Sequence, residues 1–330
     1  MRPFAYERAS SVEEAVGLLD RADVPTRLLA GGTNLVDLLK LDVEAPRLLV
    51  DVNHLGLDRI ERTDAGGLLI GATVRNSDLA ADPTVRAEYP VLARALLSAA
   101  SGQIRNQATT GGNLMQRTRC VYFMDAGKPC NKRDPGSGCP AIEGASRELG
   151  LLGTSSSCIA THPGDMGVAL AVLDAVVHYR TADGPAVLPI GEFHRLPGDD
   201  PSRDTNLPAG AMITGVEVPP LTFAATSTYR KARDRRSYAF ALASVAAAID
   251  VDGDEVRDVR LAFGGVSPRP WRARIAEELL RGAPATADSF RAAAQAELES
   301  ATPTDENRFK IDLVTRLVTG TLLELTGGVR

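Results

Sequence analysis

The chain has 330 residues, a length that suits roughly two or three domains, each large enough to bury its own core. Hydrophobic residues make up 44%, charged residues 24% and aromatic residues 5% of the sequence, which argues against a disordered, collagen-like or coiled-coil chain. The formal net charge of -5 argues against a nucleic-acid binder, which normally shows a basic excess. The longest uncharged apolar run, about residues 239–249, is too short for a membrane helix.

The amino terminus has no hydrophobic segment of the kind found in secretory signal peptides, and acidic residues follow almost at once. We therefore expect a cytoplasmic protein. Transport to the periplasm in the company of another exported protein is the alternative.

Residues 10–52 show the pattern of a compact β-turn-α-β unit preceded by a helix. Two overlapping capping boxes in Ser10–Glu14 predict where that helix starts. The elements that follow are a strand at 27–30, a glycine turn at 31–34, a helix at 35–39 and a strand at 47–52.

The rest of the chain alternates ordered elements with one irregular segment. A strand is predicted at 67–72, a helix at 89–100 and a second glycine turn at 109–113. Glycine and proline residues interrupt residues 117–163, which we interpret as an insertion. A helix-to-strand passage at 166–177 and a strand at 211–218, ended by Pro219 and Pro220, then lead to a domain boundary. Beyond it we predict a hairpin of 245–251 and 256–263, and helices at 272–280, 288–299 and 305–325.

The two glycine turns are candidate anion sites, because backbone N–H groups free of side-chain obstruction can point at a phosphate where a strand meets a helix. The first turn is not a Rossmann fingerprint, since Leu35 stands where the third glycine would be. Such a turn alone is more often structural. Two of them in one chain indicate a dinucleotide whose pyrophosphate is clamped from both loops; two unrelated tight turns are the alternative.

All four cysteines lie close together in sequence, at Cys120, Cys130, Cys139 and Cys158. Their spacing differs from the short C-x₂₋₄-C pairs usual for zinc. Disulfides require an oxidising compartment. An iron-sulfur cluster tolerates wide spacing, and nearby basic side chains would favour the thiolates it needs. The residues therefore favour a cluster over zinc, and both interpretations stay open.

The densest basic run is Arg230–Arg236, which ordinarily indicates a solvated face. A cation at Lys231 would stabilise an anionic reduced cofactor, although the spacing alone does not establish this.

Three stretches together resemble a known family: the Ala30–Asn34 turn, the run Ile104–Leu114, and Phe263–Pro268 with the following Arg272 and Ala273. They are similar to the FAD-binding medium subunits of the molybdenum hydroxylases, the xanthine dehydrogenase and carbon monoxide dehydrogenase family. Within it, the cysteine-bearing insertion resembles that of the bacterial aldehyde oxidoreductase type, whose flavin subunit holds an additional [4Fe-4S] cluster.

The resemblance implies an α+β fold: a two-lobed, PCMH-type FAD-binding domain over 1–220, with lobes of about 1–55 and 56–220, and a smaller C-terminal α+β domain with an antiparallel sheet over 221–330. It implies one [4Fe-4S] cluster on the four cysteines. The cofactor-binding residues that it implies are Leu28, Leu29, Ala30, Gly31, Gly32, Thr33, Asn34, Leu35, Thr109, Gly112, Asn113, His162, Asp165, Ile213 and Lys231. The segment around His162 departs from the small, serine-rich segment of many relatives.

The resemblance also implies partners: a small subunit with [2Fe-2S] clusters, a large subunit with the molybdenum cofactor and the substrate site, and an external electron acceptor. In that arrangement this chain has no catalytic residue for the substrate and passes electrons through FAD. A stand-alone FAD-dependent oxidoreductase and a non-catalytic zinc- or nucleotide-binding module are the alternatives. The substrate of the complex does not follow from the sequence.

Overall fold

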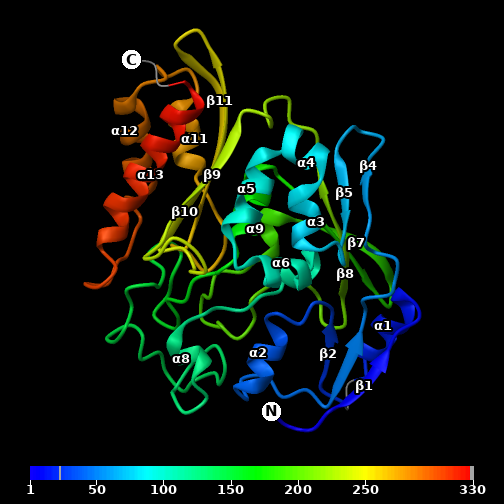
Figure 1. Cartoon of the computed structure of the whole chain (residues 1–330). Coiled ribbons are helices and arrows are strands. Elements are labelled where there is room, and N and C mark those ends of the chain that lie inside the picture. Colours follow the sequence, from blue (N-terminus) through cyan, green and yellow to red (C-terminus); the bar gives the residue numbers. More distant parts are fainter. Residues whose placement is uncertain (22–23, 328–330) are drawn as a thin grey trace.

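The computed structural model describes residues 1–21 and 24–327, in which helices pack between and against three β-sheets (Figure 1). The first sheet is parallel, in the order β1-β3-β2, and consists of β1 (Ala5–Arg8), β2 (Thr26–Leu29) and β3 (Leu48–Asp51). Helices α1 (Val12–Leu19) and α2 (Leu35–Lys40) supply its crossovers, which parallel pairing requires. The Ser11 hydroxyl accepts a hydrogen bond from the Glu14 N–H at 3.1 Å, so the predicted capping box does begin α1.

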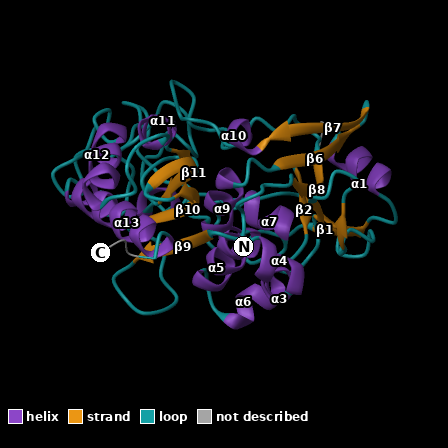
Figure 2. Cartoon of the chain, turned by 90° about the horizontal axis from the view of Figure 1, so that it is seen from above, coloured by secondary structure: helices purple, strands orange, loops and turns teal. Residues whose placement is uncertain are grey.

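The second sheet is antiparallel, in the order β4-β5-β8-β6-β7. Its strands are β4 (Ile60–Arg62), β5 (Leu68–Gly71), β6 (Val176–Thr181), β7 (Gly184–Pro189) and β8 (Met212–Val218). Apart from one short helix in the insertion, the helices that lie between these strands in the chain are α3 (Asn76–Ala81), α4 (Pro83–Glu88), α5 (Pro90–Ser98), α6 (Gly102–Gln107), α7 (Thr110–Leu114), α9 (Asp165–Val172) and α10 (Ile190–Phe193). All residues of α9 are buried, because α5 covers it on one side and β10 and β11 on another (Figure 2).

The third sheet is antiparallel and runs β12-β11-β10-β9. It contains β9 (Ser227–Ala232), β10 (Ala243–Asp252), β11 (Glu255–Gly264) and β12 (Trp271–Arg272). One face packs on α11 (Arg274–Leu280), α12 (Ala287–Glu297) and α13 (Phe309–Leu325), and the opposite face on α5 and α9 (Figure 1). Consecutive residues of β10 therefore alternate between two cores: Val245 and Ala247 face α11–α13, whereas Ala246 and Ala248 face α9.

The insertion, residues 117–163, has one short helix, α8 (Val121–Met124). Its own small core contains Phe123, Leu149 and Ile159 together with cysteine side chains, and Leu38 of α2 packs into it. The sequence interpretation of this segment as irregular is therefore confirmed for its backbone.

Three boundaries differ from the sequence predictions. Arg272 lies in β12, because it pairs with Ala262, and the helix expected from it begins at Arg274. The last helix begins at Phe309 and not at residue 305, since the Asn307 side chain accepts from the Thr304 N–H at 2.8 Å and holds a turn there. The second glycine turn is the start of helix α7.

The α+β expectation, with an antiparallel C-terminal sheet, is confirmed. No helix in the described part of the chain combines the length and apolarity needed to cross a membrane.

Candidate functional site

The first glycine turn connects β2 to α2 and lies against the end of α6. A Cβ atom on Gly31 would stand 2.0 Å from the carbonyl oxygen of Gln107, so only glycine permits this approach. Gly32 has a φ of +70°, in the left-handed region that favours glycine. Among the described residues, the N–H groups of residues 31–34 donate to no protein acceptor. This turn is therefore a row of free donors suited to an anion.

The second glycine segment is held against β5 and its continuation. Thr109 caps α7 by accepting from the Gly112 N–H at 3.3 Å, and the Gly111 N–H donates to the Ala72 carbonyl at 2.8 Å. A Cβ atom on Gly111 would meet that carbonyl oxygen at 3.3 Å. The close fit brings both glycine segments to the wall of one cavity of about 410 Å³, which we call the first cavity.

The first cavity brings together most of the cofactor residues that the resemblance implies. Those lining it are Leu28, Ala30, Gly31, Gly32, Thr33, Asn34, Leu35, Thr109, Gly112 and Ile213. Two others, His162 and Asp165, line a second cavity of about 240 Å³, between the insertion and the loop after β9. Leu29, Asn113 and Lys231 line neither of these cavities.

Gln116 and His162 separate the two cavities. Gln116 lines the first cavity and His162 the second, and Gly164 lies against both side chains. A Cβ atom on Gly164 would stand 2.6 Å from His162 Nε2 and 2.9 Å from Gln116 Nε2. The two cavities are thus neighbours.

Asp165 is the first residue of α9 and anchors a buried polar group. Its Oδ2 lies 2.8 Å from Lys231 Nζ, and its Oδ1 accepts from the Tyr229 hydroxyl at 2.5 Å. Burial, together with the nearby negative charge of Asp165, raises the pKa of Tyr229 far above its ordinary value. The Lys231 side chain is only 3% exposed, so the solvated-face interpretation of the basic run is wrong for this residue, although it holds for Arg235 and Arg236.

Two histidine rings contact each other, at an interplanar angle of 49°, where the cavities approach each other. The ring centroids of His162 and His194 are 4.1 Å apart, and both side chains are buried. Burial lowers the pKa of His194 to about 4 and that of His162 well below its ordinary value, so both imidazoles are neutral near pH 7. Among the described residues, His162 Nε2 and His194 Nδ1 have no hydrogen-bond partner, which leaves polar atoms available to a ligand.

The sequence did not predict a group of charged side chains, centred on Arg117, in the first cavity. Arg117 donates from Nε to Asp204 at 2.6 Å and from a terminal nitrogen to Glu44 at 2.8 Å, and all three side chains line the cavity. Burial alone would lower the pKa of Arg117, but the two carboxylates outweigh it and raise that pKa. These residues come from three separate segments, so no local pattern signals them.

The four cysteines surround one small cavity of about 10 Å³, the cysteine cavity. Cys120, Cys130 and Cys158 are buried and Cys139 is partly exposed, and all four are free thiols. Burial raises the pKa of Cys120, and it raises the pKa of Cys158 to about 11. Within residues 1–21 and 24–327, no three His, Cys, Asp or Glu side chains come close enough to hold a metal ion.

The fold and the paired glycine segments at one cavity are those of a protein that binds a nucleotide cofactor. Residues 2–221 match the family described as the FAD binding domain in molybdopterin dehydrogenase, and residues 227–325 match the CO dehydrogenase flavoprotein C-terminal domain. The chain belongs to this family of FAD-binding subunits of molybdenum hydroxylases. It is thus a FAD-binding subunit of an oxidoreductase, and the resemblance seen in the sequence is confirmed.

Individual relatives agree with this assignment. The chain is 52% identical over 327 residues to the aldehyde oxidoreductase FAD-binding subunit PaoB of Escherichia coli (strain K12), covering 98% of each chain. It is 32% identical over 279 residues to the glyceraldehyde dehydrogenase medium chain of Sulfolobus acidocaldarius, covering 84% of this chain and 81% of the other. The fold matches a carbon monoxide dehydrogenase structure from Hydrogenophaga pseudoflava with a TM-score of 0.77, at 24% identity, over 99% of this chain and 98% of the other.

Proposed function

We propose that the chain is the electron-transferring flavin subunit of an aldehyde oxidoreductase complex and holds both FAD and one [4Fe-4S] cluster. The observation that carries the FAD part is the meeting of both glycine segments at the first cavity. The choice of aldehyde oxidoreductase rests on the 52% identity to a subunit of that name.

For FAD, the free N–H groups of residues 31–34 and the Thr109–Asn113 segment would hold the pyrophosphate. The isoalloxazine end would extend past Gln116 toward the second cavity, where Asp165 and His162 lie. Ile213 would pack against the cofactor. Lys231 forms an ion pair with Asp165, which lines the second cavity, so this pair would lie near the ring. FAD, when bound, supplies an acceptor for electron pairs that can release them one at a time.

The four thiols around the cysteine cavity are the ligands that we propose for an iron-sulfur cluster. In a [4Fe-4S] cluster each thiolate binds a different iron, so the four sulfurs stand farther apart than around a single ion. Four thiols that line one cavity without forming a compact single-metal group agree with that requirement. Lys132 lines the same cavity, and its charge opposes the effect of burial on the pKa of Cys158, which favours the thiolate. We assign the cluster a structural role first, because the segment has few apolar residues to fold around.

The proposed cluster uses every cysteine of the chain, so [2Fe-2S] clusters that deliver electrons must belong to another polypeptide. We propose a [2Fe-2S] small subunit and a molybdenum-cofactor large subunit as partners. Aldehyde would be oxidised on the large subunit, and an external acceptor would take electrons from the flavin side of this chain.

The FAD assignment is tested with Gly31→Ala, which forces a Cβ atom against the Gln107 carbonyl. The matched control is Gly17→Ala, an exposed helix position with no heavy atom within 4 Å of the added Cβ. We expect flavin loss in the first variant and wild-type flavin content in the second. Full flavin content in Gly31→Ala would contradict the assignment of this turn.

The cluster and the subunit role are tested on protein purified without oxygen. We expect about four iron and four sulfide per chain, since that is the composition of the cluster, and loss of both on Cys130→Ser. Zinc in place of iron would support the binding-module alternative. Aldehyde oxidation by the chain alone would support the stand-alone flavoenzyme, whereas our proposal requires activity only after the partner subunits are added.

A further inference from the structure

The first cavity and the cysteine cavity share a wall that is built from charged side chains. Arg117 lines the first cavity, and its guanidinium lies 4.7 Å from the centroid of the Phe123 ring, which is buried in the core of the insertion. Lys132 lines the cysteine cavity, and its Nζ donates to Asp204 at 2.6 Å. Asp204 in turn lines the first cavity. The two cavities are therefore connected by direct side-chain contact.

Lys132 is the centre of this connection. Its side chain is 8% exposed, and its Nζ also donates to the Pro201 carbonyl at 2.9 Å. It thus fixes the loop between α10 and β8, which contributes Ser202, Asp204 and Thr205 to the first cavity. The Lys132 side chain also lines the cysteine cavity together with Cys158.

Among the described residues, the Asp204 carboxylate accepts side-chain hydrogen bonds only from Lys132 and Arg117, and its side chain is 27% exposed. Burial would raise its pKa, but Lys132 and Arg117 outweigh burial and hold that pKa below its ordinary value. One carboxylate oxygen bonds each cation. Since a partly buried carboxylate that loses one of its two cations is destabilised, displacement of Lys132 would loosen the loop that lines the first cavity.

We infer that Lys132 and Asp204 couple the cysteine site to the flavin site, so that FAD is released faster once the cysteines lose their cluster. The inference rests on the proposed function for the presence of both cofactors. Cluster thiolates attract the ammonium of Lys132 and hold the insertion together around it. Without them the insertion keeps only a small apolar core, Lys132 is no longer fixed, and the loop of Asp204 loosens.

Coupling between two sites is reciprocal in binding free energy. If loss of the cluster weakens FAD binding, then loss of FAD weakens the hold on the cluster by the same factor. Chelators should therefore remove iron more readily from flavin-free protein than from protein that has its flavin. Lys132 acts here as a positioning residue, since it touches the loop and the cysteine site and lines only the cysteine cavity.

The experiment measures the FAD dissociation rate of the full chain by the rise of free-flavin fluorescence, before and after iron is removed by a chelator without oxygen. Ordinary coupling changes an affinity at least about 5-fold, and for an unchanged association rate constant the FAD dissociation rate of wild-type protein should rise by that factor when iron is removed. In Lys132→Met with iron still bound, we expect a rate already increased and nearly unchanged by iron removal. Lys40→Met makes the same change at an exposed lysine of α2 and should behave as the wild type.

Asp204→Asn changes the other partner of the same ion pair. This variant replaces Lys132→Met in the experiment if Lys132→Met does not fold. Equal coupling in wild type, Lys132→Met and Asp204→Asn would overturn the inference, as would a wild-type rate that iron removal leaves unchanged. Purified wild-type protein that contains flavin but no iron would instead contradict the proposed cluster, and the inferred coupling would then be wrong as well. Measured iron and flavin contents of the wild type therefore separate the two failures.

Discussion

Lys310 is buried in the C-terminal domain without a carboxylate partner in the described part of the chain, and it makes the stability of that domain dependent on pH. Its Nζ donates to the carbonyls of Leu149 at 2.8 Å and Gly265 at 2.9 Å. Burial lowers its pKa from 10.5 to about 7. Between these values the unfolded chain binds a proton that the folded chain does not, so the free energy of unfolding rises with pH across this window.

Replacing Lys310 with Met removes the titrating group and keeps a side chain of similar length. Because one pKa unit corresponds to about 1.4 kcal/mol, the two pKa values predict that the unfolding free energy of wild type minus that of Lys310→Met increases by about 3 kcal/mol from about pH 7 to about pH 9.5. The variant also leaves the Leu149 and Gly265 carbonyls without their donor, which lowers its stability at every pH.

The assay is urea unfolding followed by the fluorescence of Trp271, the single tryptophan of the chain, whose indole N–H donates to Glu297 at 2.8 Å within the same domain. Flavin-free protein is used for both chains so that cofactor release does not contribute. Subtracting the two curves cancels the other titrating groups. A difference that stays constant between about pH 7 and about pH 9.5 would refute the reasoning, because Lys310 would then have the same pKa folded and unfolded.

Three further outcomes follow from buried side chains. Glu277 is fully buried, accepts a hydrogen bond from the Leu261 N–H at 2.7 Å and forms an ion pair with Arg272. Glu277→Gln should therefore lower the unfolding free energy by about 3 kcal/mol. The same change at its exposed neighbour, Glu278→Gln, should alter the unfolding free energy little. Phe290→Ala should cost about 3 to 5 kcal/mol and lower the Tm, measured by calorimetry. Folding lowers the pKa of His194 from 6.5 to about 4, so between these pH values the unfolded chain binds a proton that the folded chain does not. The unfolding free energy of the wild type should therefore fall as the pH drops from 6.5 toward 4. If urea titrations of His194→Gln give the same dependence of unfolding free energy on pH, this prediction is wrong.

Local signals predicted much of the secondary structure. The capping box at Ser11 and the Gly-containing turn at Asp252–Glu255 act within a few residues, so the start of α1 and the β10–β11 hairpin follow from the sequence. Strand β1 has four exposed residues and no alternation, and it exists because β3 lies beside it. Pairing with a distant strand is a tertiary effect that a local pattern does not contain.

Some residues of the candidate site are likewise signalled by a local sequence pattern, and others are brought together only by the fold. The glycine turns and the four cysteines are visible in the sequence, because each turn is a short run of adjacent residues and all the cysteines of the chain fall between residues 120 and 158. Arg117, Lys132 and Asp204 are ordinary charged residues whose neighbourhood exists only after folding. For Lys231 the local pattern was misleading. A basic run predicts a solvated lysine, whereas the Lys231 side chain on β9 is buried and paired with Asp165.

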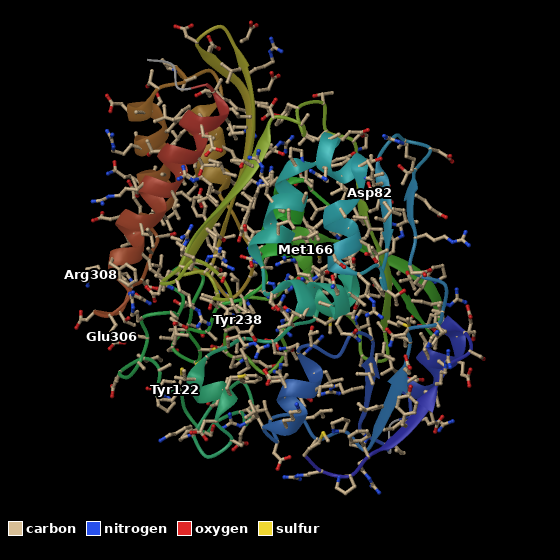
Figure 3. The ribbon with its side chains drawn as sticks, viewed as in Figure 1. Asp82, Tyr122, Met166, Tyr238, Glu306 and Arg308 are labelled. Atoms are coloured by element: carbon tan, nitrogen blue, oxygen red, sulfur yellow. The ribbon has the colours of Figure 1, made fainter. Side chains whose placement is uncertain are left out.

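The insertion also contacts the C-terminal domain. Its Ser146 N–H donates to Glu306 at 2.7 Å, and the Leu151 N–H donates to the Val266 carbonyl at 2.9 Å. In Figure 3, Tyr122 of the insertion and Glu306 lie in the same lower region of the molecule. Within the FAD-binding domain the insertion also packs on Leu38 of α2, so this one segment connects the region of the parallel sheet to the C-terminal domain, and a hinge motion between them would have to break its contacts. We therefore expect the FAD-binding and C-terminal domains to move together as one body, with the insertion as the segment that joins them.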